Sequence, residues 1–247
     1  MMADAPVLLI GGTRGTGLLI ARLLLREGVP VRVLARNAAR ASGALGNGPE
    51  VVVGDITNEA TLPDAISGAR DIVFTAGRRS GRPVRETKIR RTEYDGVLNT
   101  LAAARRVGFA GRFLYMNSSG VGSRSFWTIA LNIYKGNTLK WRERAERAIR
   151  AGVQRYTIIR AGVLTNQPGG QHAIELTQRS LPLSPRYRIA RADVAAVFVA
   201  ALRDSRTERA TFDVVWGKGT SPPVWRDLFD RVRPDSALES ATNSEQQ

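Results

Sequence analysis

The chain has 247 residues, of which 43% are hydrophobic and 24% are charged, as expected for an ordinary globular protein with a sizeable core. It contains no Cys and one His (His172), so disulfides, thiolate catalysis and Cys-based or multi-His metal sites are excluded, and no metal is expected. The net charge of +15 reflects 37 basic residues, of which only four are Lys. Because the Arg residues are spread along the chain without basic runs that contain aromatics, we expect no nucleic-acid partner.

The N-terminus does not resemble a secretory signal peptide. No basic segment precedes the apolar run over residues 7–10, and a Gly-rich turn follows that run at once. No stretch reaches the ~18 apolar residues that are needed to span a bilayer. We therefore expect a cytoplasmic monomer or homodimer that acts on a small-molecule substrate and has no membrane partner.

Strand and helix patterns alternate along the first half of the chain. Short apolar runs predict strands, and longer segments with helical periodicity predict helices between them. The expected strands cover residues 7–10, 31–35, 50–53, 71–75 and 112–116. The expected helices cover residues 16–27, 58–67 (with Asn58 as its candidate cap) and 86–107. A polar loop over 77–85 follows the fourth strand.

The alternation continues in the second half of the chain. The expected elements are a charged helix over 135–151, a strand over 156–159, a loop-rich stretch over 162–184, a helix from its cap Asp193 through Leu202, and a strand over 210–216. The polar, acidic tail over 234–247 is expected to be disordered. Without an internal repeat or a linker, strands separated by helices predict one α/β domain over residues 1–233, built on a doubly wound parallel sheet.

The turn between the first strand and the first helix carries the strongest functional signal. It reads Gly11-Gly12-Thr13-Arg14-Gly15-Thr16-Gly17. Gly allows a tight turn and a close approach of the backbone to a phosphate, and the helix start offers free N–H groups and the positive end of its dipole. A strand before it and a helix after it are the context that a dinucleotide-binding fingerprint requires. The alternative is a Gly-rich turn without a ligand.

The Gly-xxx-Gly-x-Gly spacing resembles the short-chain dehydrogenase/reductase (SDR) superfamily. More closely, the chain resembles the atypical NAD(P)H-binding branch of flavin reductase/biliverdin reductase B-like and NmrA-like proteins. The other segments that carry this resemblance, which covers residues 6–216, are Gly54-Asp55-Ile56-Thr57, Thr75-Ala76-Gly77, Asn117-Ser118-Ser119-Gly120, Tyr156-Thr157-Ile158-Ile159-Arg160-Ala161-Gly162 and Arg191-Ala192-Asp193-Val194-Ala195.

The resemblance implies a Rossmann-type single domain that binds a dinucleotide. The cofactor-binding residues that it implies are Gly11, Thr13, Arg14, Gly15, Thr16, Gly17, Asp55, Ile56, Thr75, Ala76 and Gly77.

The residue near the end of the second strand bears on the choice of cofactor. An NAD site usually has Asp or Glu there, to accept a hydrogen bond from the ribose 2′-hydroxyl. This chain has Arg36, 19 residues after Gly17, and a guanidinium can bind a 2′-phosphate with two hydrogen bonds. Arg14 indicates the same preference by resemblance to NADPH-using relatives. We therefore expect NADP(H), the alternative being that both Arg are solvated surface residues.

The catalytic pair that is usual in SDR enzymes is absent. That pair is a Tyr with a Lys four residues later, and none of the five Tyr residues of this chain is followed by Lys at that distance. The segment Trp141-Arg142-Glu143-Arg144-Ala145-Glu146 resembles the "W-K-x-x-A-E" helix of the atypical branch, with Arg142 in the Lys position. This implies that Arg142 holds ribose or phosphate, although an always-charged guanidinium is a poor proton donor.

Three residues remain as catalytic candidates. Ser118 and Ser119 follow the fifth strand near the expected nicotinamide, and Tyr134 precedes the charged helix. Each could orient a carbonyl or supply a proton. The alternatives are a strand-end cap for the two Ser and a half-buried packing aromatic for Tyr134. His172 could act as an acid or be an ordinary loop residue.

The apolar stretch over 126–131 also has several interpretations. It could form a lid or pocket wall, a helix packed on the core, or a dimer face.

Three function classes are consistent with these features. The first is an NADPH-dependent oxidoreductase that reduces a small carbonyl, enone, quinone or flavin-like substrate. The second is a non-catalytic NADP(H)-binding redox sensor or assembly factor of the NmrA-like kind, as the missing Tyr/Lys pair suggests. The third is a redox-neutral isomerase or cyclase on an SDR fold, because a fold does not dictate its function.

Overall fold

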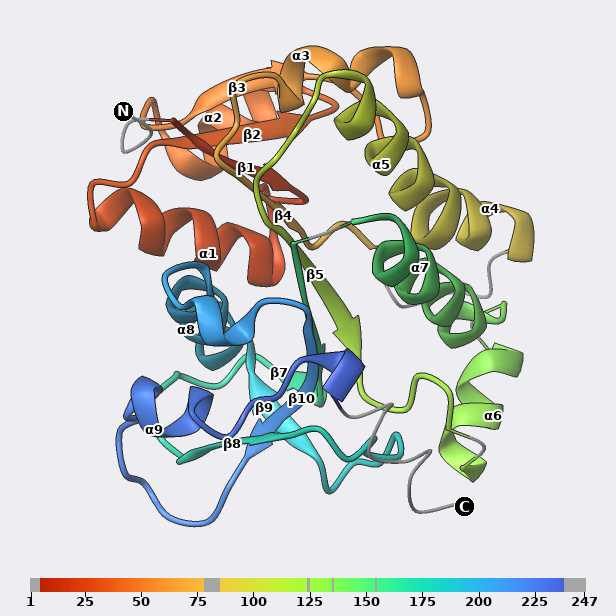
Figure 1. Ribbon diagram of the computed structural model, residues 1–247, viewed down its shortest axis with the longest axis vertical. Coiled ribbons are helices and arrows are strands. Elements are labelled where there is room, and N and C mark those ends of the chain that lie inside the picture. Colours follow the sequence, from red (N-terminus) through yellow and green to blue (C-terminus); the bar gives the residue numbers. More distant parts are fainter. Residues whose placement is uncertain (1–4, 78–84, 124, 135, 154, 238–247) are drawn as a thin grey trace.

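A central sheet of eight strands organises the molecule (Figure 1). The computed structural model describes residues 5–77, 85–123, 125–134, 136–153 and 155–237. The sheet has the strand order β3-β2-β1-β4-β5-β6-β10-β8, and β7 and β9 form a separate parallel pair. The strands are β1 (Val7–Ile10), β2 (Val31–Ala35), β3 (Glu50–Val53), β4 (Asp71–Phe74), β5 (Phe113–Ser118), β6 (Tyr156–Ala161), β7 (Val163–Thr165), β8 (Ile174–Thr177), β9 (Arg188–Ala190) and β10 (Ala210–Trp216).

The chain reverses its direction of travel across the sheet between β1 and β4, which are neighbours in parallel register. β1 also pairs with β2, so the sheet grows outward in both directions from this point. In sheets of this kind, ligands bind at such a switch point, beyond the carboxyl ends of the strands. The expected doubly wound parallel sheet is thus confirmed, and β8 adds an antiparallel edge beside β10.

Helices cover both faces of the sheet in two layers (Figure 1). The helices are α1 (Gly15–Arg26), α2 (Ala38–Leu45), α3 (Pro63–Ile66), α4 (Glu86–Arg90), α5 (Gly96–Arg106), α6 (Phe126–Tyr134), α7 (Thr138–Gly152), α8 (Arg191–Leu202) and α9 (Trp225–Phe229), with a π-turn at Arg91–Asp95 and 3₁₀ turns at Glu59–Thr61 and Ser205–Thr207. Val7 and Leu9 of β1 face α1 and α8, while Leu8 and Ile10 face the opposite layer with α3, α5 and α7. This alternation buries a strand that is apolar at every position.

Several boundaries differ from the sequence-based prediction. The expected helix over 86–107 is interrupted by the π-turn, and the expected loop over 162–184 contains β7 and β8. β5 runs on to Ser118 because pairing with β6 continues to the end of both strands. Helix α2 was not predicted, although Asn37 caps it by accepting a hydrogen bond from the Arg40 N–H. Among the described residues, none of the helices has the length and apolarity needed to cross a bilayer.

Two predicted helix caps are wrong. Helix α8 begins at Arg191, two residues earlier than expected, and Asp193 is buried inside its first turn. The Asp193 carboxylate accepts hydrogen bonds from Gly170 N–H and from Trp216 Nε1, so it ties loop and strand to the helix instead of capping it. Asn58 precedes a 3₁₀ turn, and its side chain makes no capping hydrogen bond.

Asp235, the second residue of the segment over 234–247, is fixed by several hydrogen bonds. Asp235 is only 9% exposed and accepts hydrogen bonds from Tyr156 Oη (2.9 Å), Thr211 N–H (2.8 Å) and Arg150 Nε (3.0 Å). A buried carboxylate with three partners anchors the chain against β10. The ordered part of the chain therefore extends past Pro234, while residues 238–247 lie outside the described part.

Candidate functional site

The Gly-rich turn lies between β1 and α1 and packs directly on the end of β4. A Cβ atom on Gly11, whose φ is +98°, would lie 2.6 Å from the backbone nitrogen of Ala76. A Cβ atom on Gly17 would lie 2.3 Å from Thr75 Oγ1. Neither position has room for a side chain. The structure thus brings residues 11–17 together with Thr75, Ala76 and Gly77, which were assigned to the same site from sequence.

The start of α1 is open to an anion. Its N-cap residue, Arg14, is extended and makes no capping side-chain hydrogen bond, and the first turn contains no acidic residue. Thr13 lies half-buried in the same turn. Thr16 is 5% exposed, and its Oγ1 has no hydrogen-bond partner among the described residues. Free N–H groups, a positive dipole end and a buried unpaired hydroxyl suit the pyrophosphate of a dinucleotide.

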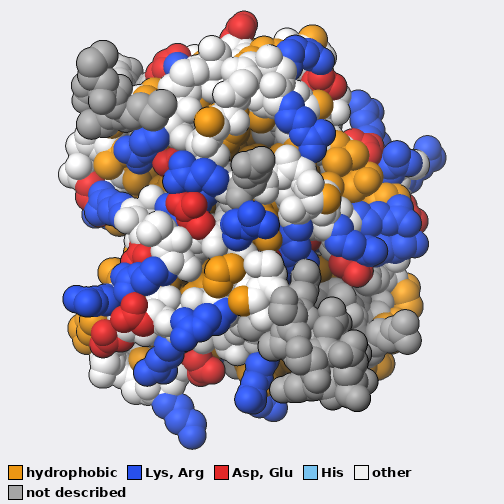
Figure 2. Space-filling model, in the orientation of Figure 1, with side chains coloured by type: hydrophobic (Ala, Val, Ile, Leu, Met, Phe, Trp, Pro, Cys, Tyr) orange, Lys and Arg blue, Asp and Glu red, His pale blue; other side chains and the backbone are white. Residues whose placement is uncertain are grey.

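Three guanidinium groups lie around the ends of β1, β2 and β4. Arg14 Nη2 donates to the Gly77 carbonyl over 3.1 Å. Arg36 is 77% exposed, and its Nη1 lies 4.0 Å from Asp55 Oδ2. Arg191 was not among the predicted site residues. Its Nε would nevertheless lie 3.9 Å from a Cβ on Gly15, so it borders the Gly-rich turn. Elsewhere on the face seen in Figure 2, Arg and Lys are interspersed with acidic and apolar side chains.

The turn after β3 is held in one conformation by its own side chains. Asp55 Oδ1 accepts hydrogen bonds from the N–H and the hydroxyl of Thr57. Ile56 is 8% exposed and packs on Gly96, and Asn99 Nδ2 donates to the Ile56 carbonyl over 2.8 Å. Asp55 therefore remains the more accessible of the two residues assigned to this turn.

Arg142 of α7 lies half-buried beside the end of β4. Its Nη2 lies 2.9 Å from Glu93 Oε2, and the two side chains are 18% and 3% exposed. A Cβ on Gly77 would lie 2.8 Å from the same Nη2, so Arg142 borders the turn assigned to the cofactor. Burial opposes the charged form, but the Glu93 carboxylate outweighs it and raises the pKa of Arg142 above its usual value. Arg142 thus stays charged, and sequence reasoning missed its partner Glu93.

The two Ser candidates differ in their surroundings. Ser118 is half-buried, and its hydroxyl donates to the Ser119 carbonyl over 3.1 Å. Ser119 is 1% exposed, and its Oγ has no partner of normal hydrogen-bond geometry among the described residues. Ser118 is therefore the candidate that a ligand can reach, while Ser119 belongs to the interior.

Ser119 lies near a buried carboxyl group, Asp213. Burial raises the pKa of Asp213 to about 6, although the Ser119 hydroxyl, the Arg160 guanidinium and the backbone of Leu181 oppose the rise. Asp213 is 1% exposed, and its Oδ1 is unpaired among the described residues. Asp213 was not singled out from the sequence, because most other residues of its strand are apolar.

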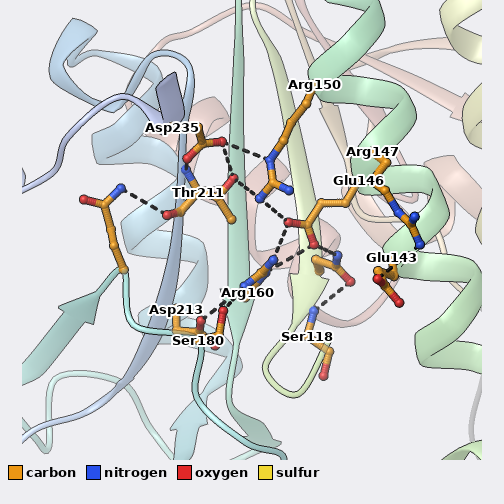
Figure 3. Close-up of polar contacts among 12 residues, drawn as sticks. Ser118, Glu143, Glu146, Arg147, Arg150, Arg160, Ser180, Thr211, Asp213 and Asp235 are labelled. Carbon is orange, nitrogen blue, oxygen red and sulfur yellow. Dashed lines mark hydrogen bonds and ion pairs between the residues drawn. The ribbon is translucent and has the colours of Figure 1, made fainter. Parts of the chain in front are cut away.

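Polar residues form one row across the sheet beneath α7. The register aligns Asn117 on β5 with Arg160 on β6, Asp213 on β10 and Thr177 on β8. Glu146 of α7 lies over this row and is 1% exposed. It accepts hydrogen bonds from Asn117 Nδ2 (2.6 Å) and Arg160 Nη2 (2.7 Å), which fasten the helix to the strands (Figure 3). It also accepts one from Arg150 Nη2 (2.7 Å), one turn later on the same helix.

A cavity of about 410 Å³ opens beside this network, between α7, the loop after β5 and the segment after β8. Figure 3 shows the charged side chains that gather here. Its lining is Val121, Gly122, Ser123, Glu143, Glu146, Arg147, Arg150, Arg160 and Ser180. The mixed charges make it a polar cavity. Within the described residues, no cluster of His, Asp and Glu is arranged to hold a metal ion.

Tyr134 and His172 lie elsewhere. Tyr134 is 54% exposed at the end of α6, so it is not the half-buried packing aromatic of the alternative interpretation. The His172 ring packs on Trp216, with 4.3 Å between the ring centroids.

Comparison with known proteins agrees with this geometry. A family model described as NAD(P)H-binding matches residues 11–205, which include the Gly-rich turn, the end of β4 and α7. The chain belongs to the NAD(P)H-binding family. The resemblance to NAD(P)H-binding proteins is thereby confirmed.

Individual relatives are distant but match over most of their length. Sanguinarine reductase of Eschscholzia californica is 28% identical over 274 residues, which cover 94% of this chain and 98% of that protein. The structure of ChuY, an anaerobilin reductase from Escherichia coli O157:H7, superposes with a TM-score of 0.70 at 22% identity, covering 88% of this chain and 100% of ChuY. A short-chain dehydrogenase/reductase from Veillonella parvula in complex with NADP gives a TM-score of 0.69 at 16% identity, covering 88% and 98%.

Proposed function

We propose that this member of the NAD(P)H-binding family is an NADPH-dependent reductase of a small carbonyl, enone, quinone or flavin-like compound. The observation that carries the proposal is the packing of the Gly-rich turn on the end of β4. Gly11 and Gly17 leave no room for a Cβ, and the open start of α1 lies beside them. This combination serves the close approach of a dinucleotide backbone.

The choice of NADPH over NADH rests on Arg36 and Arg14. Arg36 is mostly exposed, and its contact with Asp55 is 4.0 Å long, so its N–H donors remain available to a phosphate. Arg14 lies on the adjoining turn. A dianionic 2′-phosphate would be bound by charge-assisted hydrogen bonds from these groups, whereas a 2′-hydroxyl would gain far less from them. Arg191 adds a third cation near Gly15.

NADPH, when bound, supplies a hydride to an electrophilic carbon. The protein side chains then position the substrate and manage the proton. Ser118 is the reachable hydroxyl at the end of β5 and can orient a carbonyl oxygen by donating a hydrogen bond. Arg142 remains charged and buried against Glu93, so it contributes a fixed positive charge at the strand ends and no proton. Water supplies the proton in this scheme.

The polar cavity beside α7 contributes to the choice of substrate class. Its lining includes Ser123, Arg147 and Arg160. A reducible compound with a polar or anionic substituent would place that substituent among these side chains. A purely hydrocarbon substituent would leave their hydrogen bonds unmade.

The test is a screen of purified protein for NADPH oxidation at 340 nm. The panel contains aldehydes, cyclic enones, quinones, flavins and bilins, each with NADPH and with NADH. We expect turnover with NADPH for at least one class, reduced by about tenfold or more in Ser118→Ala. Ser221→Ala, which removes an exposed hydroxyl far along the chain from the site at β5, is the matched control and should leave turnover unchanged. Tight NADPH binding without turnover across the panel would contradict the proposal.

A non-catalytic NADP(H)-binding role is the second candidate. It is favoured by the absence of the Tyr/Lys pair and by the burial of Arg142 against Glu93, which leaves the site without a titratable proton donor of that kind. A redox sensor must distinguish the two cofactor forms, so its affinities for NADPH and NADP+ should differ by about tenfold or more. Calorimetric titration with each form measures this difference. Equal affinities together with no turnover would leave a redox-neutral reaction as the better hypothesis.

A further inference from the structure

In helix α6 the polar side chains face the protein and the large apolar side chains face outward, which is the reverse of an ordinary surface helix. Its sequence is FWTIALNIY, and its two polar residues other than Tyr134 point into the protein. Thr128 is 3% exposed, and its hydroxyl lies 3.0 Å from Ser125 Oγ. Asn132 Oδ1 accepts a hydrogen bond from the Leu139 N–H over 2.9 Å. A surface helix normally buries its apolar side, so this orientation indicates that the exposed side of α6 binds an apolar partner outside the protein.

The large apolar side chains of α6 face outward together. The most exposed are Phe126 at 75%, Trp127 at 52%, Ile129 at 51%, Ile133 at 81% and Tyr134 at 54%. At 100° per residue, these five positions fall within one arc of about 160° around the helix. Phe126 and Trp127 pack edge to face, with their ring centroids 5.6 Å apart. We call these five side chains the α6 patch.

The α6 patch lies at the rim of the molecule. Helix α6 stands beside α7 and away from the central sheet (Figure 1). Its packing partner among the helices is α7, to which it is joined through the Asn132 contact. The patch is therefore available to an outside surface.

The charge of the surrounding chain narrows the choice of partner. Between Asp95 and Glu143 the sequence contains no acidic residue, and it contains seven Arg or Lys. Arg124 and Lys135 flank α6 in the sequence. On α7, Lys140 and Arg144 are exposed. An apolar helix with Trp and Tyr that is flanked by cations has the composition of a helix that lies in the interface of an anionic bilayer.

A second copy of the chain fits the patch less well. Two α6 patches placed face to face would bring the flanking cations of both copies together, whereas anionic headgroups would neutralise them. The five side chains expose on the order of 500 Å². A stable protein interface needs about 800 Å² from each partner.

We infer that the α6 patch docks the protein on an anionic lipid surface, with the patch in the acyl boundary and Lys140 and Arg144 of α7 at the headgroups. This differs from the sequence-based expectation of no membrane partner. The sequence indicates an apolar stretch over 126–131, but only the tertiary structure shows that it belongs to a helix whose apolar side faces outward. The proposal is independent of the cofactor and of any enzymatic activity.

Vesicle sedimentation tests the inference. The full-length protein is mixed with vesicles of phosphatidylcholine alone or of phosphatidylcholine and phosphatidylglycerol in equal parts, at physiological ionic strength. We expect binding to the anionic vesicles to exceed binding to the neutral ones by about tenfold or more. The double variant Phe126→Asp/Ile133→Asp should lose about tenfold or more of that binding. Val224→Asp, at a residue that is 60% exposed on another part of the surface, is the matched control.

Thermal unfolding and Trp fluorescence provide two further tests. Thermal unfolding of the double variant should match that of the wild type, because both residues are exposed in the folded chain. On anionic vesicles, the Trp fluorescence of the wild type should shift to shorter wavelength. Loss of this shift in Trp127→Phe would assign it to Trp127 rather than to one of the other three Trp residues. Equal sedimentation with and without vesicles, or full binding by the double variant, overturns the inference. The inference is also overturned if light scattering shows that the wild type is a dimer and the double variant is a monomer. That result would show that the α6 patch binds a second copy of the chain.

Discussion

Arg142 and Glu93 form a buried ion pair where the chain leaves β4, with Arg142 Nη2 2.9 Å from Glu93 Oε2 and close beside Gly77. The pair connects α7 to the π-turn that precedes α5. It fixes the Arg142 guanidinium, with its charge balanced by Glu93, at the edge of the sheet where the cofactor is expected. Its partners come from positions 49 residues apart in the sequence, so only folding brings them together.

Breaking this pair on one side should be more costly than removing both charges. In Glu93→Gln the guanidinium remains buried without its counter-charge, and we expect the free energy of unfolding to fall by about 3–5 kcal/mol. The double variant Glu93→Gln/Arg142→Leu removes both charges and should lose less. Urea unfolding of the wild type and the three variants, including Arg142→Leu, completes the cycle. A double variant that is as unstable as the sum of the two single ones would show that the two groups do not interact.

Arg36 should govern the preference between the two nicotinamide cofactors. In Arg36→Ala the proposed 2′-phosphate site loses charge-assisted hydrogen bonds worth about 1.5–3 kcal/mol, so the Kd for NADPH should rise by roughly tenfold to a hundredfold. The Kd for NADH should change little, because NADH has no group at that position. Isothermal titration of both cofactors measures the ratio. Arg26→Ala, at the exposed end of α1, is the matched control, and an equal loss for both cofactors would refute the assignment of Arg36 to the phosphate.

Gly17 should tolerate no side chain. In Gly17→Ala the new Cβ would lie 2.3 Å from Thr75 Oγ1 and 2.4 Å from the Gly11 carbonyl oxygen, so the turn must move away from β4. We expect a loss of about 1–3 kcal/mol in stability and loss of NADPH-induced stabilisation. Gly43→Ala is the contrasting control, because a Cβ on Gly43 of α2 meets open space. That variant should gain up to about 1 kcal/mol. Thermal-shift measurements with and without NADPH compare the two.

Asp213 should make stability depend on pH. Its folded pKa of about 6 lies above the ordinary value of 3.8, so the folded protein holds this proton more tightly than the unfolded chain does. The favourable contribution is therefore complete below about pH 4 and is lost as the pH rises to about 6, a loss of about 3 kcal/mol. The groups that face this carboxyl are Ser119, Arg160 and Glu146, together with the backbone of Leu181.

The variant Asp213→Asn has no titratable group at this position. Its stability relative to the wild type should therefore rise between pH 4 and pH 6, as followed by urea unfolding at each pH. Asp227→Asn, at an exposed carboxylate of α9, is the matched control. A constant difference between wild type and Asp213→Asn over this range would show that Asp213 is already ionised at pH 4 in the folded protein.

The sequence by itself determined the fold and the position of the dinucleotide turn. Apolar runs such as 7–10 can be buried on both faces only in a sheet covered by two helical layers, and the structure has these layers. The Gly-rich turn could be recognised because it is local: the strand, the turn and the helix start all lie within about one βα unit. Thr75 and Ala76 were assigned to the same site through the family resemblance, and the structure packs them on Gly11 and Gly17.

Tertiary structure alone decided what surrounds these residues. The predicted start of α8 at Asp193 was wrong, because hydrogen bonds from Gly170 and Trp216 hold the Asp193 carboxylate inside the fold rather than at the helix start. Glu93 and Asp213 escaped notice because a buried charge is defined by partners far along the chain. Ser118 and Ser119 are neighbours with the same side chain, and only their opposite faces on the strand end separate the accessible one from the buried one. The outward apolar side of α6 was equally hidden, since periodicity reveals that a helix has two sides but not which of them faces water.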